Sequence, residues 1–208
     1  MPSERITAKL LIVDAGPLIT LAAAASLDYL LYANGAVVIP DAVFFEATRD
    51  ASRLGASIIV EWVNANLDRV HIAPTNAFAA FTRDYQAGEQ ERRLDLGEQA
   101  AVEYARHHIH LAMDERAVLL SEDRKVTGLR LAREEASRAI IITMRDFLLT
   151  LEQIGRINSV DAVYDAAVEA GRTPSRRELL DQHEPMLRDA VARLLGRAEP
   201  IGDNEPQA

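Results

Sequence analysis

Short runs of apolar residues recur along this chain, and segments with helical spacing of their apolar residues lie between them. The runs cover 10–13, 37–39, 70–73, 118–121 and 139–143. A short apolar run bounded by turn or polar residues is typical of a strand buried on both faces. Because parallel strands need long crossover connections, usually helices, this alternation predicts an α/β protein with a central parallel sheet covered by helices.

The connecting segments carry helix and turn signals. Residues 17–33 are rich in Leu and Ala and predict one mostly buried helix, which ends at the turn pair Asn34-Gly35. Apolar spacing also predicts helices over 56–66, 76–90 and 144–154. From Gly155 onward the apolar strand runs stop. Amphipathic patterns over 160–170 and 178–195, with a Pro- and acid-rich end over 199–208, therefore predict a helical C-terminal extension over 158–208 with a frayed end.

Composition excludes several classes of protein. The 208 residues include no cysteine, so disulfides and thiolate metal sites are impossible. The net charge of −9 argues against a protein that coats nucleic acid without specificity, because phosphate binding draws on Lys and Arg. The start of the chain has no apolar signal segment, and no apolar run approaches the length of a membrane span. We therefore expect a cytoplasmic protein without a membrane partner.

Four acids occupy strand ends or helices close to them. Asp14 follows the first strand run and Asp123 the fourth; Glu46 and Glu98 lie in predicted helices. The carboxyl ends of parallel strands share one edge of the sheet, so these carboxylates can converge there. Carboxylates without His or Cys favour Mg²⁺ or Mn²⁺. Each acid also has a purely structural interpretation, as a helix cap, an acid in a first helical turn or a solvated side chain.

Taken together, these stretches resemble the PIN-domain family, and in particular the VapC-type toxin ribonucleases and their relatives. The matching pieces are Ile12-Val13-Asp14-Ala15-Gly16-Pro17-Leu18-Ile19, Ile39-Pro40-Asp41-Ala42-Val43-Phe44-Phe45-Glu46, Leu94-Asp95-Leu96-Gly97-Glu98-Gln99-Ala100-Ala101, Leu119-Leu120-Ser121-Glu122-Asp123 and Ile140-Ile141-Ile142-Thr143. The resemblance covers about the first three-quarters of the chain. It implies a PIN-like three-layer α/β/α nuclease domain over 1–157, with the helical extension outside the match.

The resemblance also implies an activity and a set of site residues. It implies a Mg²⁺- or Mn²⁺-dependent endoribonuclease that cleaves single-stranded RNA with a metal-activated water, and that acts as the toxin of a type II toxin–antitoxin pair. Asp14, Glu46, Glu98 and Asp123 then serve as the catalytic metal ligands. The implied partners are the RNA substrate, a cognate antitoxin protein and a second copy of the chain in a homodimer.

The fourth ligand has two candidates. Asp123 lies 25 positions after Glu98, which is longer than the usual family spacing, whereas Asp114 lies 16 positions after it. We prefer Asp123, because residues 118–121 form the better strand, and keep Asp114 as the alternative. Asp95, Glu122 and Asp146 are reserve acids.

Two other functions fit the same residues. One is a non-catalytic binding or scaffold protein that has the PIN fold and acts through its helical tail. The other is a metal-dependent phosphohydrolase of small substrates. The net charge of −9 gives both some weight.

Overall fold

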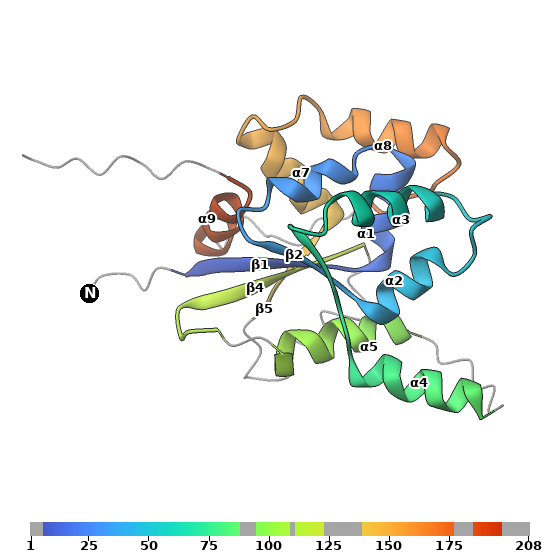
Figure 1. Cartoon of the computed structure of the whole chain (residues 1–208). Helices are drawn as coiled ribbons and strands as arrows, with labels where there is room; N and C mark the ends of the chain where they lie inside the picture. Colours follow the sequence, from blue (N-terminus) through green and yellow to red (C-terminus); the bar gives the residue numbers. More distant parts are fainter. Residues whose placement is uncertain (1–5, 88–94, 109–110, 123–138, 177–184, 197–208) are drawn as a thin grey trace, which may run out of the picture.

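A five-stranded parallel sheet forms the centre of the protein (Figure 1). The structure is a computed structural model, and it describes residues 6–87, 95–108, 111–122, 139–176 and 185–196. The strand order is β3-β2-β1-β4-β5, and each neighbouring pair is parallel. The strands are β1 (Thr7–Val13), β2 (Ala36–Pro40), β3 (Val70–Ala73), β4 (Glu115–Ser121) and β5 (Ala139–Thr143). The predicted α/β class with a central parallel sheet is confirmed.

Helices cover both faces of this sheet and make it the middle of three layers. Figure 1 shows α1 (Ala15–Ala23), α3 (Ala56–Ala65), α7 (Met144–Gln153) and α8 (Val160–Glu169) on one side. On the other side lie α4 (Asn76–Gln86) and α5 (Leu96–Glu103), which continues into the π-helical turn η2 (Tyr104–His108). Helix α2 (Asp41–Thr48) follows β2 and packs against α5. The sequence therefore folds into the predicted PIN-like α/β/α arrangement.

The two covered faces explain why the strands contain continuous apolar runs. Alternate residues of a strand point to opposite faces. In β1, Leu11 and Val13 belong to the larger hydrophobic core, whereas Ile12 belongs to a second core with Ala101 and Leu119. All three β1 residues are fully buried. A strand with this environment needs apolar residues at every position, which is the pattern found in the sequence.

The segment predicted as one helix over 17–33 forms two helices. Helix α1 ends at Ala23, and a separate 3₁₀ helix, η1, runs over Leu27–Tyr32. Between them Ala25 has a φ of 51°, which is the left-handed region that alanine rarely adopts, and the Ser26 hydroxyl donates to the carbonyl of Ala24. An Ala-rich segment contains no local signal for this break.

The C-terminal helices pack into the main core. Tyr164 of α8 and Val191 of α9 (Pro185–Leu194) are fully buried in the same hydrophobic cluster as Leu11. Helix α9 packs beside β1, and the side-chain amide and backbone amide of Asn34 donate to the carbonyls of Arg193 and Leu194. The predicted frayed end lies largely outside the described residues, since 197–208 are not described. No helix within the described ranges is long and apolar enough to cross a membrane.

Candidate active site

Asp14 lies where β1 meets α1 and is held in a fixed orientation. Its Oδ1 accepts from the backbone N–H of Ala15 at 2.8 Å, and its Oδ2 accepts from the Ser121 hydroxyl at 3.0 Å. Ser121 is the last residue of β4, the neighbouring strand, so both groups lie at the carboxyl edge of the sheet. The predicted cap is therefore present, and each carboxylate oxygen keeps a lone pair for a further partner.

The electrostatic environment of Asp14 disfavours its negative charge. Burial raises the pKa of the Asp14 carboxyl group, and the charge of Glu122 raises it further. The hydrogen bonds from Ala15 and Ser121 oppose this shift because they stabilise the carboxylate. A partly buried carboxylate whose pKa is raised by a neighbouring acid is typical of a functional site, and a cation bound beside it would relieve the repulsion.

Glu46 is brought close to Asp14 by helix α2. Partial burial and the negative charge of Asp14 raise the pKa of the Glu46 carboxyl group, and Asp95 adds to the shift. The positive charges of Arg49 and Arg53 act in the opposite direction. Asp14 and Glu46 are 32 positions apart in the sequence, so the effect of the Asp14 charge on Glu46 places the two acids near each other in the fold.

Gly97, the residue before Glu98, lies beside Glu46. A Cβ atom on Gly97 would lie 2.7 Å from Oε2 of Glu46, so the Glu46 carboxylate occupies the space beside the Gly97 backbone. Glu98 follows in the first turn of α5 and is only 9% exposed. The Glu46 carboxylate therefore lies beside the backbone of Gly97, the residue that directly precedes Glu98.

The two candidates for the fourth acid have different outcomes. Asp123 lies outside the described residues, directly after the described Ser121 and Glu122. Asp114 is exposed and precedes β4, and its carbonyl accepts from the N–H of Thr7 at the beginning of β1. Asp114 thus lies at the amino edge of the sheet, opposite the edge that carries Asp14. The structure thus places Asp14 near Glu46 and the Gly97 backbone beside the Glu46 carboxylate, and it leaves Asp114 at the opposite edge.

Glu122 forms a network that the sequence did not predict as such. It accepts from the Thr20 hydroxyl of α1, and Arg172 donates to its Oε2 at 2.6 Å. The Nε of Arg172 also donates to Thr20 Oγ1 at 3.2 Å. A Cβ atom on Gly16 would lie 2.7 Å from Cβ of Glu122, so only glycine fits there without displacing this acid. Glu122 therefore has structural partners, while its charge still acts on Asp14.

Ser121 and Asp95 are the other residues around the site that sequence reasoning did not select as members. Ser121 orients Asp14, and its only sequence signal is a hydroxyl residue at the end of an apolar strand. Asp95 adopts a left-handed conformation, with φ of 66°, directly before α5. Asp tolerates that conformation better than most residues, which places one more carboxylate near Glu46.

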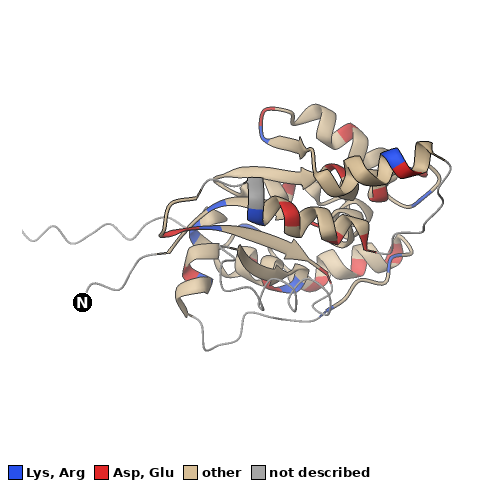
Figure 2. Cartoon of the chain, turned by 90° about the horizontal axis from the view of Figure 1, so that it is seen from below, with Lys and Arg blue, Asp and Glu red and all other residues tan. Residues whose placement is uncertain are grey.

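The donor chemistry of the site fits a hard divalent cation, because every candidate ligand is a carboxylate oxygen. Among the residues that the structure describes, no three His, Cys, Asp or Glu side chains are grouped closely enough to hold a metal ion. Figure 2 shows acidic and basic positions interspersed over the helices and strand ends. The candidate acids are therefore distinguished by their position at the sheet edge and by the charges that act on them rather than by number.

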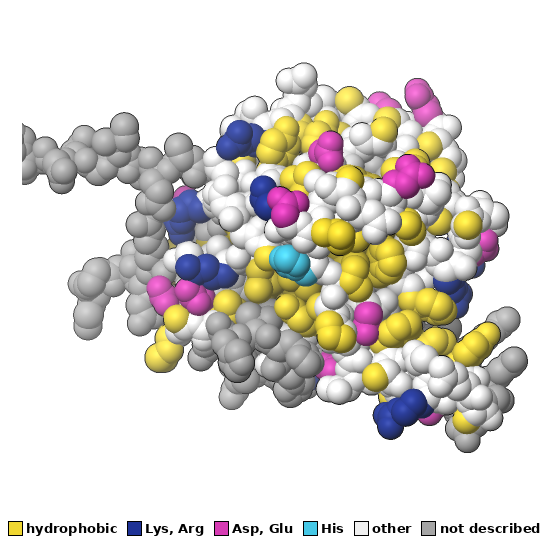
Figure 3. Space-filling model, in the orientation of Figure 1, with side chains coloured by type: hydrophobic (Ala, Val, Ile, Leu, Met, Phe, Trp, Pro, Cys, Tyr) yellow, Lys and Arg dark blue, Asp and Glu magenta, His cyan; other side chains and the backbone are white. Residues whose placement is uncertain are grey.

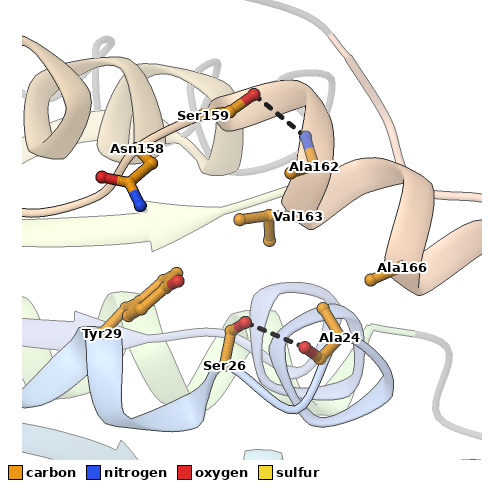
Figure 4. A pocket seen from close by; sticks show the side chains of 8 residues that line it. All are labelled: Ala24, Ser26, Tyr29, Asn158, Ser159, Ala162, Val163 and Ala166. Atoms are coloured by element: carbon orange, nitrogen blue, oxygen red, sulfur yellow. Dashed lines mark hydrogen bonds between the residues drawn. The ribbon is translucent and has the colours of Figure 1, made fainter.

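A separate cavity of about 210 Å³ lies between η1 and α8 (Figure 4). Its lining includes Tyr29, Ser26, Ser159 and Asn158, and it contains no charged side chain. It is smaller than typical ligand pockets and lacks acids, bases and metal ligands. It therefore offers no chemistry comparable to that of the acidic edge.

The structure thus combines a parallel three-layer α/β fold with acids, Asp14 and Glu46, near the carboxyl edge of its sheet, which is where ligands bind in open α/β sheets. Comparison with protein families matches residues 10–171 to DUF3368, a PIN domain. The chain belongs to the PIN-domain family. PIN domains are generally nucleases, and they typically use divalent metals. Comparisons with curated proteins and with solved structures give no match.

Proposed function

We propose that this protein is a Mg²⁺- or Mn²⁺-dependent endoribonuclease that cleaves single-stranded RNA, and that it is the toxin of a type II toxin–antitoxin pair. The observation that carries the proposal is the position of Asp14 at the carboxyl edge of the sheet of a PIN domain, near a second acid, Glu46. PIN domains generally bind RNA and often antitoxin partners. Its partners in this proposal are RNA, an antitoxin protein and a second copy of the chain, and its site of action is the cytoplasm.

In this proposal Asp14, Glu46, Glu98 and Asp123 hold the cation. A bound Mg²⁺ or Mn²⁺ supplies a Lewis acid that lowers the pKa of a water molecule and offsets charge on the phosphate. Asp14 is oriented by Ala15 and Ser121, so its free lone pairs keep a constant direction. Gly97 leaves the space that the Glu46 carboxylate occupies. The chain thus contributes oxygen donors held in fixed orientations.

The test of the activity is cleavage of labelled single-stranded RNA by the purified protein in Mn²⁺, in Mg²⁺ and in excess EDTA. We expect internal cleavage with either metal, no cleavage in EDTA, and recovery when metal is added back, because the acidic ligands cannot act without the cation. Turnover of a small phosphate ester without RNA cleavage would instead identify a phosphohydrolase. RNA binding without turnover of either substrate would identify a binding protein.

Gly97→Ala is expected to reduce cleavage about 10- to 100-fold, the loss usually seen when the support of a metal ligand is disturbed. The new Cβ atom would lie 2.7 Å from Oε2 of Glu46 and 3.3 Å from Cγ2 of Val43, so the Glu46 carboxylate must move away. Because that carboxylate is the end of a flexible side chain, the protein should stay folded. The measurement is the initial rate of RNA cleavage, together with the thermal unfolding midpoint.

The matched control for this variant shortens the displaced side chain. In the Gly97→Ala/Glu46→Asp protein the shorter carboxylate has room again, so adding Gly97→Ala should cause little or no further loss relative to Glu46→Asp alone. If Gly97→Ala slows cleavage equally in both backgrounds, steric displacement of Glu46 is not the cause.

A further inference from the structure

Four aromatic side chains form a continuous series across helices α2 and α4. The ring centroids of Phe45 and Phe78 are 5.3 Å apart, those of Phe78 and Phe81 are 6.0 Å apart with nearly parallel planes, and those of Phe81 and Tyr85 are 6.0 Å apart and also stacked. Phe45 and Phe81 are themselves 5.9 Å apart. We call Phe45, Phe78, Phe81 and Tyr85 the aromatic ladder.

One end of the aromatic ladder adjoins the acidic site. Phe45 directly precedes Glu46 on α2, and the guanidinium of Arg49 lies 5.7 Å from the centre of the Phe45 ring. The same Arg49 charge lowers the pKa of the Glu46 carboxyl group, so the cation faces both the ring and the acid. The ladder therefore begins with an aromatic ring and an exposed cation beside a candidate metal ligand.

The other end of the aromatic ladder is open to solvent. Helix α4 has no buried residue, Phe78 and Phe81 are half-buried against a small cluster around Ala42, Leu96 and Ala100, and Tyr85 is 65% exposed. Figure 3 shows hydrophobic side chains where α2 adjoins α4. Core packing accounts for the inner rings but gives no reason for a large exposed ring at the outer end.

Helix α4 is also held rigidly in place. The Glu103 carboxylate of α5 accepts from the backbone N–H groups of Asn76 and Ala77 at 2.7 and 2.8 Å. The Thr75 hydroxyl accepts from the N–H of Phe78 and donates to Asp41 at the start of α2. These bonds fix α4 to both α5 and α2, so the rings keep their positions relative to the acids.

Exposed aromatic rings next to a cation suit single-stranded nucleic acid. Every base has a flat face that stacks on an aromatic ring, and Arg contacts the phosphate between bases. In a protein of net charge −9, phosphate contacts alone supply little affinity, so stacking must contribute much of it. A double-stranded substrate has its bases already stacked and could not use this surface.

We propose that the aromatic ladder is a stacking platform for the bases of single-stranded RNA, with Tyr85 and Phe81 receiving bases and Arg49 contacting the backbone that leads to the acidic site. This proposal rests on the proposed function, because it assigns a path to the RNA that the site would cleave. The proposal accounts for an unbroken series of rings from Phe45, next to Glu46, to the exposed Tyr85.

The test is binding of a short fluorescent oligoribonucleotide, measured by anisotropy with full-length protein in the non-cleaving Asp14→Asn background. Adding Tyr85→Ala should weaken binding about 5- to 100-fold, which corresponds to the loss of one stacked base. Adding Tyr85→Trp should preserve binding and quench Trp fluorescence when RNA is added. The control is Leu67→Ala, which removes an apolar side chain that is 62% exposed elsewhere and should leave the affinity unchanged.

An abasic oligonucleotide separates stacking from general apolar contact. It should bind the parent and Tyr85→Ala proteins equally, because it has no base to stack. Equal affinity of the parent and Tyr85→Ala proteins for the normal oligonucleotide, while wild-type protein still cleaves RNA, would overturn the platform and leave the nuclease function intact. If wild-type protein neither cleaves nor binds RNA, both proposals fall. A change in oligomeric mass for Tyr85→Ala, without a change in RNA affinity, would identify the ladder as a protein interface instead.

Discussion

Replacing Asp14 by Asn should reduce metal-dependent RNA cleavage at least about 100-fold while the protein stays folded. Changes to groups that only support a metal ligand commonly cost 10- to 100-fold, so removing a charge from a direct ligand should cost more. The measurement is the single-turnover cleavage rate in saturating Mn²⁺. Induced expression of the wild type in a bacterial host should arrest growth, as a toxin would, and expression of Asp14→Asn should not.

The same substitution should raise the thermal unfolding midpoint by about 2–4 °C, the shift that about 1 kcal/mol produces in a chain of this length. Asn removes the repulsion with Glu122 and Glu46 and the burial of a charge, which together raise the pKas of Asp14 and Glu46. It also retains the cap, because its side-chain oxygen can accept from Ala15 and its amide can donate to Ser121. Loss of activity with gain of stability is the result expected for a functional carboxylate.

Two comparison variants make the Asp14 result specific. Asp14→Ala should lose cleavage to the same degree but be about 1 kcal/mol less stable than Asp14→Asn, because it also removes the helix cap. Asp68→Asn makes the same change in net charge at an exposed position and should alter neither property. An Asp14→Asn protein that is less stable than wild type and still cleaves RNA would show that Asp14 only caps α1.

The sequence predicted the sheet well because both of its faces are buried. Continuous apolar runs identified β2, β4 and β5, and the same pattern identified the buried half of β1. The polar beginnings of β1 at Thr7 and of β4 at Glu115 have no such signal, because backbone pairing with a neighbour defines them. An apolar run in the sequence predicts the buried middle of a strand. The first residues of the strand are set by backbone pairing with the neighbouring strand.

The candidate site could be predicted only in part from the sequence, because some of its contacts join residues far apart in the chain. Acids at strand and helix ends could be selected from the sequence, and the coupling of Asp14 to Glu46 supports that choice. The hydrogen bond from Ser121 and the ion pair of Arg172 with Glu122 join residues 107 and 50 positions apart, so no local pattern predicts them. Likewise, amphipathic spacing predicted helices in the C-terminal part, but their burial against the main core required the folded structure.

Gly35→Ala should destabilise the fold by at least about 3 kcal/mol, at the upper end of what overpacking usually costs. The sequence predicted that Gly35 belongs to the turn after a helix, and the structure adds a steric reason for glycine there. A Cβ atom there would lie 1.9 Å from the carbonyl oxygen of Lys9 and 2.8 Å from its carbonyl carbon. Both are backbone atoms, and the pairing of Leu10 with Ala36 holds the two segments together. Relief would therefore require separation of β1 from β2 at this end of the sheet.

The appropriate control is Gly171→Ala, which tests glycine's conformational freedom without a clash. Gly171 has a φ of 91° and nothing within 4 Å of its missing side chain, so alanine there should cost only about 1 kcal/mol of backbone strain. Thermal unfolding followed by circular dichroism should give midpoints lowered by about 6–12 °C for Gly35→Ala and about 2–4 °C for Gly171→Ala. Equal shifts would mean that β1 and β2 adjust to relieve the contact of the new Cβ atom with the Lys9 backbone. Because Gly35 lies at the amino edge of the sheet, opposite the acids, Gly35→Ala protein that remains folded at low temperature should still cleave RNA at the wild-type rate.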